Sequence, residues 1–167
     1  MTPTRETVGA FTVAGIATRT NNRDERDPAQ ARLGALWQRF FAEGIAQQVQ
    51  PGALQPRVMG VYSHYASDQD GDFDVLAGVA LGGATGVPEV PDVPVAPRFT
   101  QVAVPAGEYL VFRRQGTLPQ AVIDTWIDIW HYFQQQQQQP PVRRRFAVDF
   151  EAYEGPDRVA VYIGVLG

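Results

Sequence analysis

The chain has 167 residues, which is long enough for one domain with a sizeable core and short for two. Hydrophobic residues make up 44% of it and charged residues 19%, which is typical of a globular protein. The net charge of −4 argues against nucleic acid as a direct partner, because phosphate binding needs clustered Lys and Arg. The absence of cysteine excludes disulfides, thiolate catalysis and cysteine-ligated metal sites.

The N-terminal segment, residues 1–20, contains no apolar run long enough for a signal peptide or a membrane span. We therefore expect a cytoplasmic protein that forms a single domain over residues 1–167 and does not associate with membranes. Within this segment, residues 11–20 are rich in β-branched and apolar side chains, which predicts the first strand.

A helix is predicted next, and it ends at Pro51-Gly52. Asp27 suits the N-cap and Pro28 the first helical position. Apolar residues then recur at helical spacing from Leu33 to Ile45. Two strands follow.

These two strands are predicted over residues 57–67 and 72–81, joined by the acidic turn DQDGD. Residues 82–98 are rich in Gly and Pro and predict a linker. Strand patterns return over residues 99–116, around Pro105-Ala106-Gly107. A second helix and a second pair of strands follow, as in the first part of the chain.

The second helix is predicted to start at a capping box formed by Thr117 and Gln120, and apolar residues recur at helical spacing from Val122 to Phe133. The glutamine run that follows is typical of a solvated helix end and loop. Residues 146–167 predict the last two strands around a short turn.

The order strand, helix, strand, strand therefore occurs twice, in residues 8–81 and 99–167. Gly78 in "VLAGVAL" corresponds to Gly164 in "VYIGVL". We predict an α+β fold of two duplicated β-α-β-β units with pseudo-two-fold symmetry. Its antiparallel sheet carries two helices on one face, and a cleft lies between the halves.

A single acid, Glu151, stands among apolar and aromatic residues in the first of the last two strands. Clefts between repeated units favour small-molecule sites, and a buried carboxylate needs a partner. We expect this partner to be a lipophilic, positively charged ligand, which aromatic rings also attract through cation–π contacts. The candidate ligand-binding residues are Glu151, Trp126, Trp130, Tyr62, Tyr153, Tyr162 and Tyr65. Alternatively, strand alternation points Glu151 to water and Phe150 into the core.

Three short segments in this order carry a resemblance: "VPAGEY" (104–109), "TWIDIW" (125–130) and "DFEAY" (149–153). From about residue 8 to 167 the chain resembles the GyrI-like family of effector-binding domains. The resemblance implies the duplicated fold and a cleft glutamate at the position of Glu151. Its aromatic lining corresponds to Trp126, Trp130, Tyr153 and Tyr162.

The family's regulators carry a helix-turn-helix domain ahead of this module, and we expect none here because the domain begins within the first dozen residues. The chain is thus similar to stand-alone members, including those on integron gene cassettes. We expect a drug-binding module related to transcription regulation, with any contact to DNA made through a separate DNA-binding chain.

Two other functions remain open. Some members resemble hydrolases of strained-ring alkylating compounds, in which Glu151 would be the general base and Tyr62 or Tyr153 a hydrogen-bond donor. Others resemble inhibitors of DNA gyrase, which would make gyrase a protein partner. No cofactor is expected, and no metal site, because His64 and His131 lie far apart in the sequence.

Overall fold

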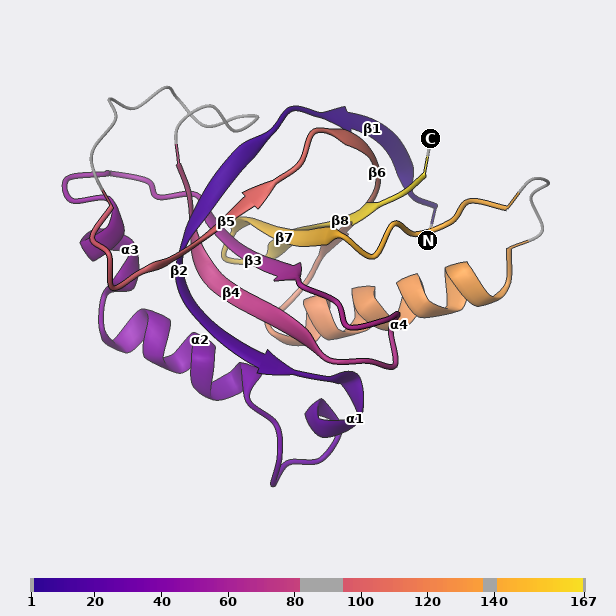
Figure 1. The fold of residues 1–167 in the computed structure, drawn as a ribbon, viewed down its shortest axis with the longest axis horizontal. Coiled ribbons are helices and arrows are strands. Elements are labelled where there is room, and N and C mark those ends of the chain that lie inside the picture. The colour runs from indigo at the N-terminus through magenta and orange to yellow at the C-terminus, as the bar shows by residue number, and fades with distance from the viewer. Residues whose placement is uncertain (1, 82–94, 137–140, 167) are drawn as a thin grey trace.

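The computed structural model describes residues 2–81, 95–136 and 141–166. Eight antiparallel strands form one curled sheet, and the helices lie on its outer face (Figure 1). The strands are β1 (Thr4–Val8), β2 (Phe11–Thr20), β3 (Val58–Ser63), β4 (Phe73–Ala80), β5 (Thr100–Val104), β6 (Gly107–Gln115), β7 (Val148–Gly155) and β8 (Arg158–Gly164). The helices are α1 (Asn22–Glu25), α2 (Leu33–Ala42), α3 (Ile45–Val49) and α4 (Gln120–Gln134).

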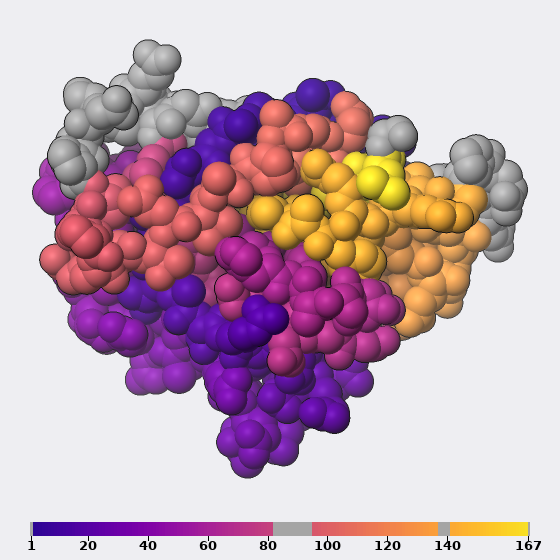
Figure 2. All heavy atoms as spheres, in the orientation of Figure 1, coloured from indigo at the N-terminus to yellow at the C-terminus, as the bar shows by residue number. Residues whose placement is uncertain are grey.

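The order of the strands is symmetric about the centre of the sheet. It runs β1-β6-β8-β7-β3-β4-β2-β5, so exchanging β1–β4 for β5–β8 gives the same order reversed. β3 and β7 meet at the centre, and their residues lie directly against each other in the space-filling view (Figure 2). The predicted α+β fold of two related units, with an antiparallel sheet and the helices on one face, is confirmed.

Each half gives its first strand to the other half. β1 pairs with β6, and β5 pairs with β2. The sequence did not predict β1, because its residues TRETV show no apolar alternation and only Val8 is buried. The expectations for residues 82–94 in the linker and 137–140 in the glutamine run lie outside the described residues.

The predicted first helix is wrong in its start and in its continuity. Asp27 caps no helix; its side chain accepts a hydrogen bond from the Ala29 N–H in a turn, and α2 begins only at Leu33. The helix also breaks at Gly44, whose φ of 60° is left-handed, so α3 runs in a different direction from α2. A short α1 precedes both segments.

The predicted capping box is also wrong. No side chain caps the start of α4; Thr117 contributes its carbonyl oxygen, which accepts from the Ala121 N–H. The Gln120 side chain donates to Asp124 instead of reaching back. In the first hairpin, β3 ends at Ser63, four residues earlier than predicted.

Alternate residues of each strand enter different cores. The inner core lies within the curl and includes residues from both edge strands, with the Phe150 ring at its centre. The ring centroids of Phe11, Tyr109 and Tyr162 lie 5.3, 5.5 and 4.4 Å from that of Phe150. Two outer cores lie under the helices, one under α2 and α3 and one under α4.

Candidate functional site

A groove lies between the two outer cores, with α2 on one side, α4 on the other and β3 and β7 at its floor. We call it the central groove. Its volume is about 2150 Å³, which exceeds the roughly 300–1,000 Å³ of an ordinary small-molecule pocket. Trp126 packs against both outer cores and therefore joins the two sides of the groove. The cleft expected between the halves is present.

Glu151 lies on the floor of this groove. Because strand side chains alternate, Phe150 points into the inner core and Glu151 to the opposite face. That face is covered by helices, so Glu151 is only 2% exposed and does not point to open water. Gly60 faces it across the β3–β7 pair, and a Cβ there would lie 2.7 Å from Glu151 Oε1. Glycine at this position therefore leaves the space that the carboxylate occupies.

Three neutral donors hold the carboxylate. Tyr62 Oη donates to Glu151 Oε2 at 2.7 Å, Trp126 Nε1 to the same oxygen at 2.6 Å, and Tyr153 Oη to Oε1 at 2.8 Å. Hydrogen bonds to a charged group contribute about 1.5–3 kcal/mol each, which offsets the several kcal/mol that burying an ion costs. No basic side chain in the described ranges pairs with Glu151, so its charge is solvated but not neutralised.

The ionisation of the groups around Glu151 follows from their burial. Burial raises the pKa of Glu151 above its ordinary value, while the hydrogen bonds from Trp126, Tyr62 and Tyr153 oppose the rise. Burial, together with the charge of Glu151, raises the pKa of Tyr62 and Tyr153 well above the usual tyrosine range. Both hydroxyls therefore stay protonated and act as donors.

A second acid on the same face of β7, Asp149, is fully buried and is neutralised. Arg144 Nη2 donates to Asp149 Oδ2 at 2.7 Å, Tyr65 Oη donates to the same oxygen at 2.5 Å, and the Gly164 N–H donates to Oδ1 at 2.8 Å. Arg144 and Tyr65 line the groove beside it. Sequence analysis missed this ion pair; the only signal was the acid two residues before Glu151.

Most of the candidate residues come together. Glu151, Tyr62, Tyr65, Trp126, Trp130 and Tyr153 all line the central groove. Tyr162 does not: it lies on the other face of the sheet and stacks on Phe150. The reason is alternation along β8, where Val161 and Ile163 point to the helices and Tyr162 to the inner core.

Sequence analysis also missed Trp37 of α2. Its ring packs edge-on against Tyr153 at a centroid distance of 5.4 Å and stacks with Phe41. The signal was present, since Trp37 and Phe41 form a second apolar stripe beside Leu36 and Phe40, which already cover the sheet. A helix with two adjacent apolar stripes can pack one of them against the sheet and present the other to the groove.

The described residues offer neither a metal cluster nor a membrane-spanning helix. No cluster of three or more His, Asp or Glu side chains there could hold a metal ion. Among the helices of that part of the chain, none has the length and apolar character needed to cross a bilayer.

Comparison with known proteins was made on sequence and on fold. The family model "Integron-associated effector binding protein" matches residues 6–165. The integron cassette protein VCH_CASS2 from the mobile metagenome of Vibrio cholerae is 30% identical, with coverage of 99% of this chain and 96% of that chain and a TM-score of 0.79.

More distant solved structures share the fold. A putative transcription regulation protein from Staphylococcus aureus is 21% identical, with 100% and 99% of the two chains covered and a TM-score of 0.70. The protein SAV2435, in a structure with bound tetraphenylphosphonium, is also 21% identical, with 100% and 95% covered and a TM-score of 0.70. A search of curated proteins gave no significant match.

Proposed function

The chain belongs to the Cass2 family of integron-associated effector-binding proteins, and on that premise we propose that its effector is a lipophilic organic cation bound in the central groove. The family implies a small-molecule ligand. The chemistry of the groove supports the finer assignment, because its walls are aromatic and aliphatic while its floor carries one negative charge.

One observation carries the proposal: the carboxylate of Glu151 is buried and has three neutral donors and no cationic partner among the described residues. A buried acid that serves only stability is normally paired with a base, as Asp149 is with Arg144. A ligand cation above Glu151 would supply the missing charge. A neutral ligand would leave it uncompensated, and an anion would be repelled.

The rings around the carboxylate favour the same class of ligand. The ring centroids of Tyr62 and Trp126 lie 5.0 Å apart, and those of Trp126 and Trp130 lie 6.4 Å apart. Aromatic faces attract a cation by roughly 0.5–2 kcal/mol each, and they accept bulky apolar substituents without strict geometry. Ring contacts thus provide affinity for many lipophilic ions, and Glu151 selects the sign of charge.

The test is a calorimetric titration with tetraphenylphosphonium, a cation already observed bound to a protein of this fold. In Glu151→Gln the charge is lost while the shape and most hydrogen bonds remain. We expect affinity to fall by about 1–3 kcal/mol, or roughly 5- to 150-fold. The free energy of unfolding should stay the same or rise, since an uncompensated buried charge is removed.

Glu154→Gln is the matched control. Glu154 also lines the groove, but it is more exposed and lies 3.8 Å from Arg57, so its charge already has a partner. We expect its removal to change affinity less than Glu151→Gln does. Equal affinity of the wild type and Glu151→Gln for the cation would exclude Glu151 from the site and remove the proposal.

Hydrolysis of strained-ring compounds is a second candidate, favoured by the tyrosine hydroxyls on Glu151. A carboxylate with a raised pKa is suited to act as a base, and an adjacent hydroxyl can donate to a leaving oxygen. The mass of a strained alkylator after incubation with the protein distinguishes the two candidates: turnover that Glu151→Gln abolishes supports hydrolysis, and binding without turnover supports the effector module.

A further inference from the structure

The walls of the central groove extend well beyond the carboxylate. On α2 the residues facing it are Leu33, Trp37 and Phe41, at successive helical turns. On α4 they include Ile123 and Ile127, also one turn apart. From the helical rise, the α2 stripe is about 12 Å long, and the α4 lining as a whole, from Val122 to Trp130, has about the same length. The groove is therefore an elongated trough with Glu151 at its floor.

Much of this apolar wall is exposed in the described structure. Phe41 is 67% exposed, Ile123 47% and Ile127 39%, and exposed Leu54 lines the same groove. Within the described ranges, Leu166 is the one other large hydrophobic residue that is exposed. An apolar surface gathered around a charged floor is typical of a ligand site rather than of scattered surface residues.

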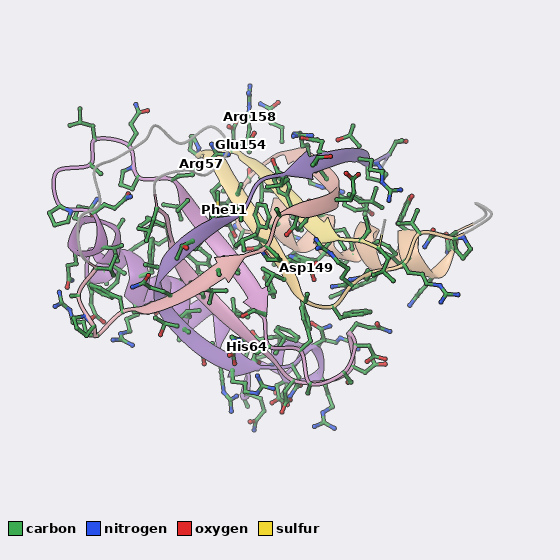
Figure 3. The ribbon with its side chains drawn as sticks, turned by 45° about the horizontal axis from the view of Figure 1, so that its top comes forward. Phe11, Arg57, His64, Asp149, Glu154 and Arg158 are labelled. Atoms are coloured by element: carbon green, nitrogen blue, oxygen red, sulfur yellow. The ribbon has the colours of Figure 1, made fainter. Side chains whose placement is uncertain are left out.

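Several other charges at the groove have ion-pair partners. Arg144 is paired with buried Asp149, and Arg57 lies beside Glu154 at the β7–β8 turn (Figure 3). Glu25 accepts hydrogen bonds from the Leu33 N–H and other neutral donors at the start of α2, and unlike Glu151 it is only partly buried. Among the described residues, Glu151 is thus the one buried acid of the lining without an ion-pair partner, and a long apolar surface extends beside it.

We propose that the groove binds cationic amphiphiles, molecules with one positive head, held at Glu151, and one extended alkyl chain, which lies between the stripes of α2 and α4. Quaternary alkylammonium ions are the simplest members of this class. The inference rests on the proposed function and narrows its ligand class. Compact polyaromatic cations use the floor of the groove alone, whereas an amphiphile also covers Phe41, Ile123 and Ile127.

Two consequences follow from the physics of burial. Each methylene added to the chain should raise affinity by about fourfold while it still enters the trough, and affinity should level off once the chain is longer than the stripes. A second ammonium at the far end of the chain should lower affinity, because it would leave water to lie against apolar side chains, and the other acids of the lining, Glu25 and Glu154, already have hydrogen-bond or ion-pair partners.

The experiment is a calorimetric titration series on the full chain with octyl-, decyl- and dodecyltrimethylammonium below their micelle concentrations. A bis-quaternary decane carrying the same head group at both ends serves as the matched dication. The double variant Ile123→Gln/Ile127→Gln removes the apolar edge of α4 at two exposed positions. Leu166→Gln is its control, since it changes an equally exposed residue outside the groove lining.

We expect a gain of about fourfold per methylene in the wild type and in Leu166→Gln, and a gain below about twofold in the double variant. The dication should bind more weakly than the decyl monocation. Affinities that do not depend on chain length, or a dication that binds as tightly as the monocation, would overturn the inference. A change from dimer to monomer in the double variant would also overturn it, by assigning the two isoleucines to contact between copies.

Failure of this inference differs from failure of the proposed function. If tetraphenylphosphonium binds and Glu151→Gln weakens it, the proposed function stands whatever the chain-length series gives. If tetraphenylphosphonium binding does not depend on Glu151, the site itself is wrong, and chain-length dependence would then report only a surface contact.

Discussion

Asp149 and Glu151 lie two residues apart on the same face of β7, and both are buried. Each accepts a hydrogen bond from a tyrosine hydroxyl, Tyr65 for the first and Tyr62 for the second. They differ in charge compensation, because among the described residues only Asp149 has an arginine partner. Two acids of one strand thus differ: one completes an internal ion pair, and we propose that the other keeps its charge available to a ligand in the groove.

The titration of Glu151 gives a prediction about pH. Its pKa is raised in the folded protein, and only its ionised form attracts a cation. Affinity for tetraphenylphosphonium should therefore fall as the pH drops through the raised pKa, in a range above that of an ordinary glutamate. Calorimetric titrations from neutral to mildly acidic buffer measure this, and Glu151→Gln should show a flat profile. A flat wild-type profile would contradict it.

The raised pKa of Glu151 has the opposite effect on the free energy of unfolding. Because the folded state holds the proton more tightly than the unfolded chain, this group favours folding at low pH. Its contribution declines as the pH rises from the unfolded pKa through the folded one. Cation affinity and the folding contribution of Glu151 therefore change in opposite directions with pH, and denaturant unfolding in the same buffers separates them.

At the scale of elements, the break between α2 and α3 shapes the groove. Gly44 adopts a left-handed conformation there, so α2 ends and the chain turns. Leu36 and Phe40 can then cover the sheet while Trp37 and Phe41 remain in the lining of the groove. A continuous helix would carry its apolar stripe past the sheet and would not leave this face free.

Two glycines at opposite ends of the α2 segment should respond in opposite directions to substitution by alanine. Gly44→Ala should lower the free energy of unfolding by about 1–2 kcal/mol, because a side chain disfavours the left-handed conformation. Gly34→Ala should raise it by up to about 1 kcal/mol, because Gly34 lies inside α2 and an added Cβ has no heavy atom within 4 Å. Denaturant unfolding measures both, and a loss of stability in Gly34→Ala would contradict the assignment.

At the scale of the whole molecule, the halves are joined by exchanged strands as well as by the central β3–β7 pair. β1 completes the second half and β5 the first. Neither half has its full set of strands without the other. We therefore expect the duplicated units to unfold as one cooperative structure, with a groove at their junction that depends on both.

This exchange predicts how the chain behaves when it is cut between Leu81 and Phe99. Fragments 1–81 and 99–167 should each lack a cooperative unfolding transition, since each leaves a core strand with an unpaired edge. Mixed in equal amounts, they should form a one-to-one complex with a cooperative transition. Circular dichroism and size-exclusion chromatography measure this; a fragment that folds alone as a monomer would contradict the prediction.

The sequence by itself determined the repeat and the positions of most strands, because periodicity is a local property. Residue chemistry is local as well, and it indicated Glu151 with Tyr62, Tyr65, Trp126, Trp130 and Tyr153 as candidates, which the fold brings to one groove. Only the tertiary structure decided what depends on partners distant in the chain: the pairing of β1 with the second half, the Arg144–Asp149 ion pair, the free face of Trp37, and the place of Tyr162 in the inner core. Alternation shows that Tyr162 and Ile163 point to opposite faces of a strand, but which face meets the groove is set by how the sheet curls and where the helices pack.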